Sequence, residues 1–421
     1  MHRIRTLVLA VATLAFAAGA AAQTDVSVWF HSGKGPEREA LNAQVEAFNA
    51  SQNSYRVVAE QLPEGTYNDQ VQAAALSSDL PCLLDFDGPF IYNYAWSGFL
   101  QPIDRFVSDE LRADVLPSIL SQGTYDGALY SLGTFDSGLG LYGNRAYLEA
   151  AGVRIPTSVD DAWTIQEFEA ALAALTALPE VEYALDLKFN YGQGEWFTYG
   201  FAPILWSAGV GMIDRDGYQN ADPLRSGAAV TAMEHFQSWF ENGWATNAPA
   251  GDVDFHERKI AALSWVGHWQ YNPHSEALGD DLVLLPLPDF GAGSKTGMGS
   301  WNWGITSSCN EADGAWAFLE FLMQPDEILR MSNANGAVPA RFSAIERSDL
   351  YGEGGPLELF VAQLSSSAVP RPQTPAYPVV TDAFAEAVAN ISGGADVAAE
   401  LNRAADRIEQ DIEDNRGYPT D

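Results

Sequence analysis

Positive charge is scarce in this sequence. Its 421 residues include 22 lysines and arginines against 56 aspartates and glutamates, which gives a formal net charge of −34. Such an excess of acid repels nucleic acids and anionic membrane surfaces and keeps a protein soluble. It also disfavours an anionic ligand unless an arginine is placed beside that ligand. We therefore expect no nucleic-acid partner.

Cysteine is nearly absent, since the chain has only Cys82 and Cys309. Neither has the CxxC or histidine-ligand spacing of a redox or zinc site, and the six histidines show no metal spacing either. We expect no metal and no cofactor. In an exported chain, two cysteines favour a disulfide over two free thiols.

Long apolar runs are missing after the first 22 residues. The N-terminus, MHRIRTLVLAVATLAFAAGAAAQ, combines Arg3 and Arg5 with a short apolar run and small residues, which is typical of a secretory signal peptide. No cysteine follows the expected cleavage near Ala22, which argues against a lipid anchor. We leave residues 1–22 out of the fold and expect the mature chain in the periplasm or outside the cell.

Familiar catalytic signatures are missing as well. The sequence has no GxSxG, no Walker loop, no HExxH and no EF-hand loop. A pair of acids for glycoside hydrolysis stays open, because a sequence does not give the separation of two carboxylates. The pattern favours binding over catalysis, and a secreted glycoside-active enzyme is the remaining enzymatic alternative.

The first part of the mature chain alternates strands and helices. Apolar runs at 26–30, 55–61 and 82–86 are separated by segments of helical periodicity, which predicts a parallel sheet with helices on its faces. The chain is too long for one compact core, so two lobes are expected. Ligands bind beyond the carboxyl ends of parallel strands, a rule that singles out His31-Ser32, Glu64 and Asp87. Each could instead be a turn residue or a helix cap.

The segment 255–303 concentrates tryptophan. Trp269 and Trp301 stand near glycines at the ends of apolar runs, a placement that suits stacking on a flat ligand face. For each tryptophan the alternative is ordinary core packing. A second aromatic region further upstream includes Trp196.

Five segments resemble, in their order, the extracellular solute-binding proteins of bacterial ABC importers, in particular the carbohydrate-binding group that includes maltose-binding protein. They read ALSSDLPCLLDFDGPFIYNYAWSGFLQPID, YDGALYSLGTFDSGLGLYGNRAYLEAAGVRIPTSVDDAWTIQEF, FHERKIAALSWVGHW, WNWGITSSCNEADGAWAFLEFL and GAVPAR. Each segment alone is a weak signal, and their order along nearly all of the mature chain is the specific one. Cys82 stands where the family usually has aspartate, and Glu257-Arg258 where glycine is common.

The resemblance implies an α/β, two-lobe fold of periplasmic-binding-protein type II, with three hinge crossovers and a central ligand cleft. We expect the crossovers near 133–137, 287–290 and 336–341. The N-terminal lobe would hold 24–134 plus 290–336, and the C-terminal lobe 138–286 plus 341–421. The strand after the second crossover would run antiparallel beside the third strand, which would bring Cys309 to Cys82 within one lobe and supports their disulfide.

By motif position, the resemblance implies ligand contacts for eight residues: Asp87, Asp136, Trp269 and Trp301, and less directly Glu64, Trp196, His268 and Arg341. The implied function is capture of a mono- or oligosaccharide, with an α-glucoside as one candidate, and its delivery to ABC permease subunits by a monomeric receptor. The HSGKG segment after the first strand also resembles relatives that bind glycerol phosphodiesters. A glycerol phosphodiester or glycerol phosphate is therefore the alternative ligand.

Overall fold

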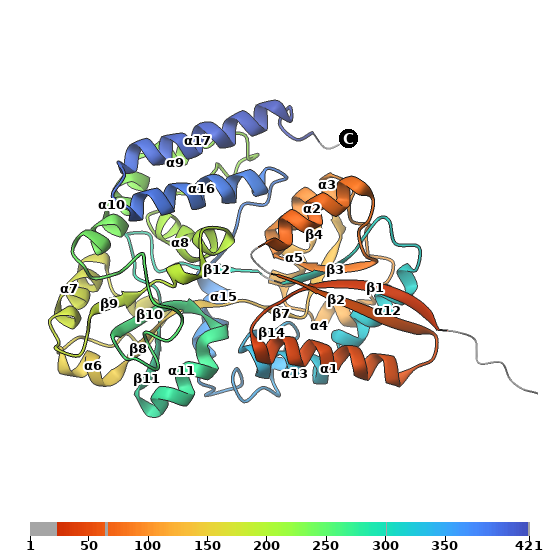
Figure 1. Ribbon diagram of the computed structural model, residues 1–421, viewed down its shortest axis with the longest axis horizontal. Helices are drawn as coiled ribbons and strands as arrows, with labels where there is room; N and C mark the ends of the chain where they lie inside the picture. Colours follow the sequence, from red (N-terminus) through yellow and green to blue (C-terminus); the bar gives the residue numbers. More distant parts are fainter. Residues whose placement is uncertain (1–22, 64–65, 300, 420–421) are drawn as a thin grey trace, which may run out of the picture.

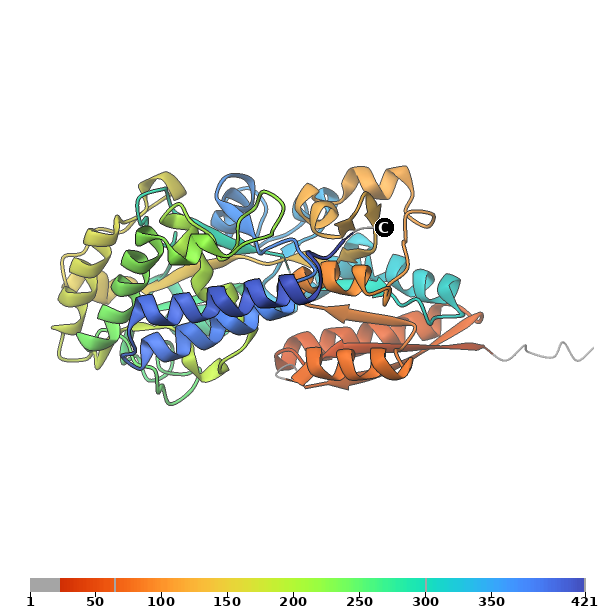
Figure 2. The same ribbon diagram turned by 90° about the horizontal axis from the view of Figure 1, so that it is seen from above.

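The computed structural model describes residues 23–63, 66–299 and 301–419. The predicted signal peptide, residues 1–22, and Glu64 lie outside these ranges. Two lobes lie side by side, each with its own sheet and its own covering helices (Figures 1 and 2). The predicted two-lobe α/β fold is therefore confirmed.

The first lobe is built on a five-stranded sheet in the order β2-β1-β3-β13-β6. The central strands pair in parallel, as the sequence predicts, while β13 runs antiparallel to both β3 and β6. Val26, Val28 and Phe30 alternate toward the core because strand side chains point to opposite faces. The strands are β1 (Thr24–His31), β2 (Tyr55–Leu62), β3 (Leu83–Phe86), β6 (Ser131–Gly133) and β13 (Asn302–Ile305), with a hairpin of β4 (Thr124–Tyr125) and β5 (Ala128–Leu129).

Helices cover both faces of this sheet (Figure 1). They are α1 (Gly35–Ser51), α2 (Tyr67–Ser77), α3 (Ile91–Trp96), α4 (Asp109–Asp114), α5 (Pro117–Gln122), α12 (Ala312–Leu322) and α13 (Pro325–Asn335), and the 3-10 turn η2 (Gly88–Phe90) precedes α3. Pro325 begins α13, because the fixed φ of proline suits the first turn of a helix.

The second lobe is built on a four-stranded sheet in the order β11-β8-β10-β9. Its strands are β8 (Leu139–Asn144), β9 (Tyr183–Asp186), β10 (Ala261–Gly267) and β11 (Leu282–Leu285), and a separate parallel pair joins β12 (Thr296–Met298) to β15 (Ala368–Pro370). Its helices are α6 (Arg145–Ala150), α7 (Ile165–Thr176), α8 (Glu195–Ser207), α9 (Asp222–Arg225), α10 (Gly227–Glu241), α11 (Tyr271–Leu278), α15 (Glu358–Ser366), α16 (Tyr377–Ser392) and α17 (Val397–Asp414), with 3-10 turns η3 (Val159–Asp161), η4 (Phe189–Tyr191), η5 (His268–Gln270) and η6 (Gly279–Asp281). A capping box of Thr164 with Glu167 starts α7.

The chain passes between the lobes in short extended segments. The first passage, β7 (Phe135–Asp136), pairs antiparallel with β14 (Val338–Pro339), which leads into α14 (Phe342–Ile345) and belongs to the third passage. In the second passage, the segment after Leu287 stays with the second lobe at first. The Ala292 amide donates to the Ser207 carbonyl at 2.7 Å, and β12 pairs with β15. The chain thus reaches the first-lobe sheet only after Met298, later than the expected 287–290. The lobe boundaries themselves stay a prediction.

The predicted disulfide is confirmed. Cys82, just before β3, is bonded to Cys309, just after β13, and their Cα atoms are 4.4 Å apart across 227 residues of sequence. The antiparallel pairing of β13 with β3 brings these two strand ends together. Among the helices of the described ranges, none has the length and apolar character that a bilayer crossing requires.

We expect the variant Cys82→Ser with Cys309→Ser to lower the free energy of unfolding by about 2–5 kcal/mol, because the bridge closes a long loop in the unfolded chain. Urea denaturation of the variant and of the oxidised parent measures the difference. Alkylation without reductant should leave the mass of the parent unchanged, and two alkylated thiols would contradict the bridge.

Candidate functional site

A cluster of aromatic rings lies where the two lobes meet. The Trp269 indole, on η5, packs edge-on to Trp196 at the start of α8, with ring centroids 5.8 Å apart, and contacts Tyr199 at 6.2 Å. Trp269 Nε1 donates to the Tyr191 hydroxyl at 3.1 Å. Trp196 and Trp269 are both half-buried and pack against two hydrophobic clusters, one of the second lobe and one that contains residues of both lobes. The rings therefore border the junction and are not sealed inside one lobe.

Local backbone chemistry explains the position of Trp269. A Cβ atom on Gly267 would lie 2.1 Å from the Trp269 ring, so only glycine leaves room for the indole to fold back over the end of β10. In the sequence, the glycine near this tryptophan is the feature that favours a ligand-binding site over core packing.

The second predicted stacking residue, Trp301, stands on the first-lobe side. Its indole lies flat on the His31 imidazole, with centroids 3.6 Å apart and an interplanar angle of 5°, and meets Tyr67 edge-on at 5.7 Å. Trp301 is half-buried. Trp265 and Trp303, from the same tryptophan-rich segment, are 0% and 4% exposed. These two belong to the cores, which is the alternative that the sequence left open for each tryptophan.

A buried arginine that sequence reasoning missed joins the two lobes. Arg371 follows β15, is 1% exposed, and donates from Nη2 to Asp87 Oδ1 at 2.7 Å and to the Gly299 carbonyl. Its Nη1 pairs with Glu195 of α8, and its guanidinium lies over the Tyr199 ring, 4.9 Å from the centroid. Asp87 comes from the first lobe, at the end of β3, and Glu195 from the second, so one guanidinium holds carboxylates of both lobes.

The polar groups around Glu195 reinforce this cluster. Thr381 Oγ1 donates to Glu195 Oε2 at 2.6 Å, and the Tyr377 hydroxyl donates to Oε1. Burial raises the pKa of Glu195 to about 7, although the Arg371 guanidinium opposes that rise.

Asp136, on the first passage between the lobes, is fully buried. Its Oδ1 accepts from the backbone amides of Ser137 and Gly299, each at 2.8 Å. Burial raises the pKa of this carboxyl, and the two amides oppose the rise. Asp136 thus ties two of the passages together and stands beside the carbonyl that Arg371 binds.

The structure brings four of the eight predicted residues to one place. Arg371 and Tyr199 form the centre, and around them lie Asp87, Asp136, Trp196 and Trp269. Trp301 faces the first lobe beside His31. Glu64 lies outside the described residues.

The other two predicted residues have structural partners of their own. His268 is 4% exposed, its Nδ1 is 2.9 Å from the Asn335 carbonyl, and burial lowers its pKa to about 4. Arg341 donates to Asp114 at 2.7 Å and to the Met323 carbonyl at 2.8 Å, so its guanidinium stabilises the α4 end of the first lobe.

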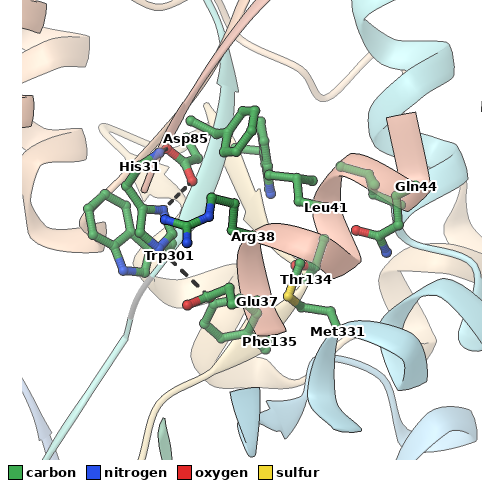
Figure 3. Close-up of a pocket in the computed structure, with 13 residues that line it drawn as sticks. His31, Glu37, Arg38, Leu41, Gln44, Asp85, Thr134, Phe135, Trp301 and Met331 are labelled. Carbon is green, nitrogen blue, oxygen red and sulfur yellow. Dashed lines mark hydrogen bonds and ion pairs between the residues drawn. The ribbon is translucent and has the colours of Figure 1, made fainter. Parts of the chain in front are cut away.

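An open pocket of about 580 Å³, within the size range of ligand pockets in proteins, is lined by Gln373, two residues after Arg371, but by none of the eight predicted residues. Both lobes line it, the first with Tyr92 and Tyr125 and the second with Tyr218 and Gln373, whose amide donates to the Tyr92 hydroxyl at 2.7 Å. A much smaller cavity of about 20 Å³ lies behind His31 and Trp301 (Figure 3). The smaller one holds no more than a single water.

Two lobes joined by three extended passages, with a polar and aromatic site between them, define a two-lobe binding protein. The family model described as bacterial extracellular solute-binding protein matches residues 43–352, and the chain belongs to that family. A Brucella abortus (strain 2308) protein named as a binding protein is 23% identical over 314 residues, 72% of each chain.

Solved structures share the fold. The GacH receptor of Streptomyces glaucescens GLA.O superposes with a TM-score of 0.78 at 20% identity, covering 93% of this chain and 98% of that one. The maltotriose binding protein of Thermus thermophilus gives a TM-score of 0.76 at 18% identity, covering 92% and 100%.

We expect Arg371→Met to lower the free energy of unfolding by about 3–5 kcal/mol at pH 8, because the change leaves Asp87 and Glu195 buried without their cation. The loss should shrink as the pH falls toward 5, since burial raises the pKa of Glu195 and protonation neutralises this carboxylate. Urea denaturation across that pH range measures both effects.

The matched control is Arg56→Met, which breaks the exposed pair with Asp25 and should leave the urea midpoint nearly unchanged. If Arg371→Met shifts the midpoint no more than this control, the ion pair does not hold the lobes as described.

Proposed function

We propose that this chain is the receptor of an ABC importer that captures a mono- or oligosaccharide between its two lobes and presents it to the membrane permease. The observation that carries the proposal is the aromatic cluster of Tyr191, Trp196, Tyr199 and Trp269 at the junction, directly beside the Asp87–Arg371–Glu195 cluster.

The chemistry of that junction suits a sugar. Sugar rings offer apolar C–H faces, which stack on indole and phenol rings, and hydroxyl edges, which donate to carboxylates and accept from guanidinium. Trp269 and Trp196 supply faces, while Asp87 and Arg371 supply a paired acceptor and donor. An uncharged ligand with many hydroxyls uses all of these groups.

The local charge disfavours the alternative ligand, a glycerol phosphodiester or glycerol phosphate. Three carboxylates, Asp87, Asp136 and Glu195, surround the single guanidinium of Arg371. Lys34, a first-lobe cation near the junction, pairs with Asp252 of the second lobe at 2.8 Å, and the buried Lys188 pairs with Asp186 at 2.6 Å. A phosphate that bound Arg371, Lys34 or Lys188 would have to displace a carboxylate from that cation, which costs charge-assisted hydrogen bonds.

The relatives support an oligosaccharide. The GacH receptor is known in complex with acarbose, and the Thermus thermophilus protein is known bound with maltotriose. The 580 Å³ pocket beside the junction would give this chain room for further sugar units. An α-glucoside of two or more units is therefore the first candidate.

Transport then follows from a hinge. The three passages between the lobes would bend as the lobes close on the ligand, and the closed form would be the one that the permease recognises. The protein would act as a monomer in the periplasm or outside the cell and would release its ligand chemically unchanged.

We expect isothermal titration calorimetry to detect binding of at least one α-glucoside from a panel that also includes monosaccharides, glycerol 3-phosphate and a glycerol phosphodiester. Affinity should rise from one to three sugar units as the pocket fills. Prolonged incubation should release no reducing ends. Release of reducing ends would support the secreted glycoside-active enzyme instead, and tight binding of a phosphodiester alone would support the alternative ligand.

We expect Trp269→Ala to weaken sugar binding at least tenfold, about 1.4 kcal/mol, because the change removes the central ring of the cluster. Trp244→Ala is the matched control, since Trp244 is also half-buried in the second lobe and is absent from the ring contacts of the described cluster. Equal affinities of the two variants would contradict stacking on Trp269.

A further inference from the structure

His31, the last residue of β1, is held between two carboxylates (Figure 3). Its Nδ1 lies 2.6 Å from Asp85 Oδ2, and its backbone amide donates to Asp85 Oδ1 at 3.0 Å. On the other side of the ring, Nε2 lies 3.7 Å from Glu37 Oε1 of α1. All three side chains are largely buried. The ring can neither rotate nor tilt without losing a charged partner.

The face of this fixed imidazole supports Trp301. The two rings are stacked nearly parallel at 3.6 Å, and Tyr67 closes the edge of the indole at 5.7 Å while its hydroxyl donates to the Asp85 carbonyl at 2.6 Å. The groups that hold Trp301 and the groups that hold His31 are therefore parts of one cluster. The cavity of about 20 Å³ behind them has no room for a ligand, which points to a positioning role.

We infer that His31, clamped by Asp85 and Glu37, is a positioning residue that fixes the Trp301 indole as the first-lobe stacking platform for the ligand. This inference rests on the proposed sugar-binding function. His31 stacks on one face of the Trp301 indole, and the opposite face would meet the ligand. The effect of His31 on binding therefore acts through the indole.

The same clamp continues to the second lobe. Asn335 Nδ2 donates to Glu37 Oε1 at 3.0 Å, and the Asn335 carbonyl is 2.9 Å from His268 Nδ1, in the residue next to Trp269. Asn335 ends α13, directly before the third passage between the lobes. Polar contacts thus connect the support of Trp301 with the support of Trp269 across the hinge.

The charge of His31 matters for the stack. Burial lowers the pKa of this imidazole, but Asp85 and Glu37 together raise it well above 6.5. His31 in turn helps to lower the pKa of Glu37 to about 2, against the effect of burial. The other charged or titratable groups close to this cluster are Arg38 on α1, Tyr67 on α2 and His268, whose charge would act on Glu37.

A charged imidazole attracts the indole face more strongly than a neutral one does. Because the pKa of His31 is raised in the folded protein, the charged stack is present at neutral and lower pH. It is lost as the pH rises through that pKa. Sugar affinity should fall over the same pH range.

The test measures affinity for the best sugar of the panel by calorimetry from pH 5 to pH 9, together with the His31 titration by NMR on histidine-labelled protein. His31→Gln should weaken binding at least tenfold at pH 7. Glu37→Gln keeps the His31 imidazole and should bind sugar like the parent at pH 5. In this variant, the pH at which sugar affinity falls and the pH at which His31 titrates should both be lower than in the parent. His235→Gln, which breaks a similar pair between His235 on α10 and Glu169 on α7, is the control and should match the parent throughout.

The outcomes separate the two claims. Sugar binding that is unchanged in folded His31→Gln, or a pH profile that is identical in Glu37→Gln and the parent, overturns the positioning role alone. A parent protein that binds no sugar overturns the proposed function and the platform with it. If His31→Gln does not fold, the shift of the Glu37→Gln profile decides the question.

Discussion

The arrangement of the two lobes depends on one buried guanidinium. Burying a charge is costly unless ion pairs and hydrogen bonds compensate it, and Asp87 of the first lobe together with Glu195 of the second compensates the charge of Arg371. Separating the lobes would expose Arg371 and Asp87 to water and break their bond. The relative position of the lobes and the charge state of this cluster are therefore coupled.

That coupling explains why the aromatic rings and the carboxylates share one location. Tyr199 packs under the Arg371 guanidinium and beside Trp269, so the ion pair also orders the ring cluster. Asp136 fastens the first passage to the Gly299 segment, whose carbonyl Arg371 binds. The hinge, the charged cluster and the rings thus meet within a few contacts, and a ligand bound there would act on all three.

Much of the fold could be predicted from the sequence, because strand alternation and the Thr164–Glu167 capping box are short-range signals and the family segments follow one another in order along the chain. The site was predicted less well, because it depends on partners distant in sequence. Arg371 stands among prolines without periodicity, and its carboxylates lie 284 and 176 residues away. From the sequence, Arg341 was the arginine predicted to contact the ligand, yet in the structure it binds Asp114, 227 residues away. Trp265 and Trp269 differ in role only because β10 ends between them.

The same reasoning bears on the acid excess of the chain. A net charge of −34 distributed over the surface would repel any anionic ligand, so an anion receptor of this composition would need cations left available at its junction. Here Arg371 is engaged by Asp87 and Glu195, Lys34 by Asp252 and Lys188 by Asp186. The carboxylates inside the site at least balance its cations, so the site, like the whole chain, carries no excess of positive charge. An uncharged ligand, recognised by ring faces and hydroxyl groups, is the one that this distribution does not oppose.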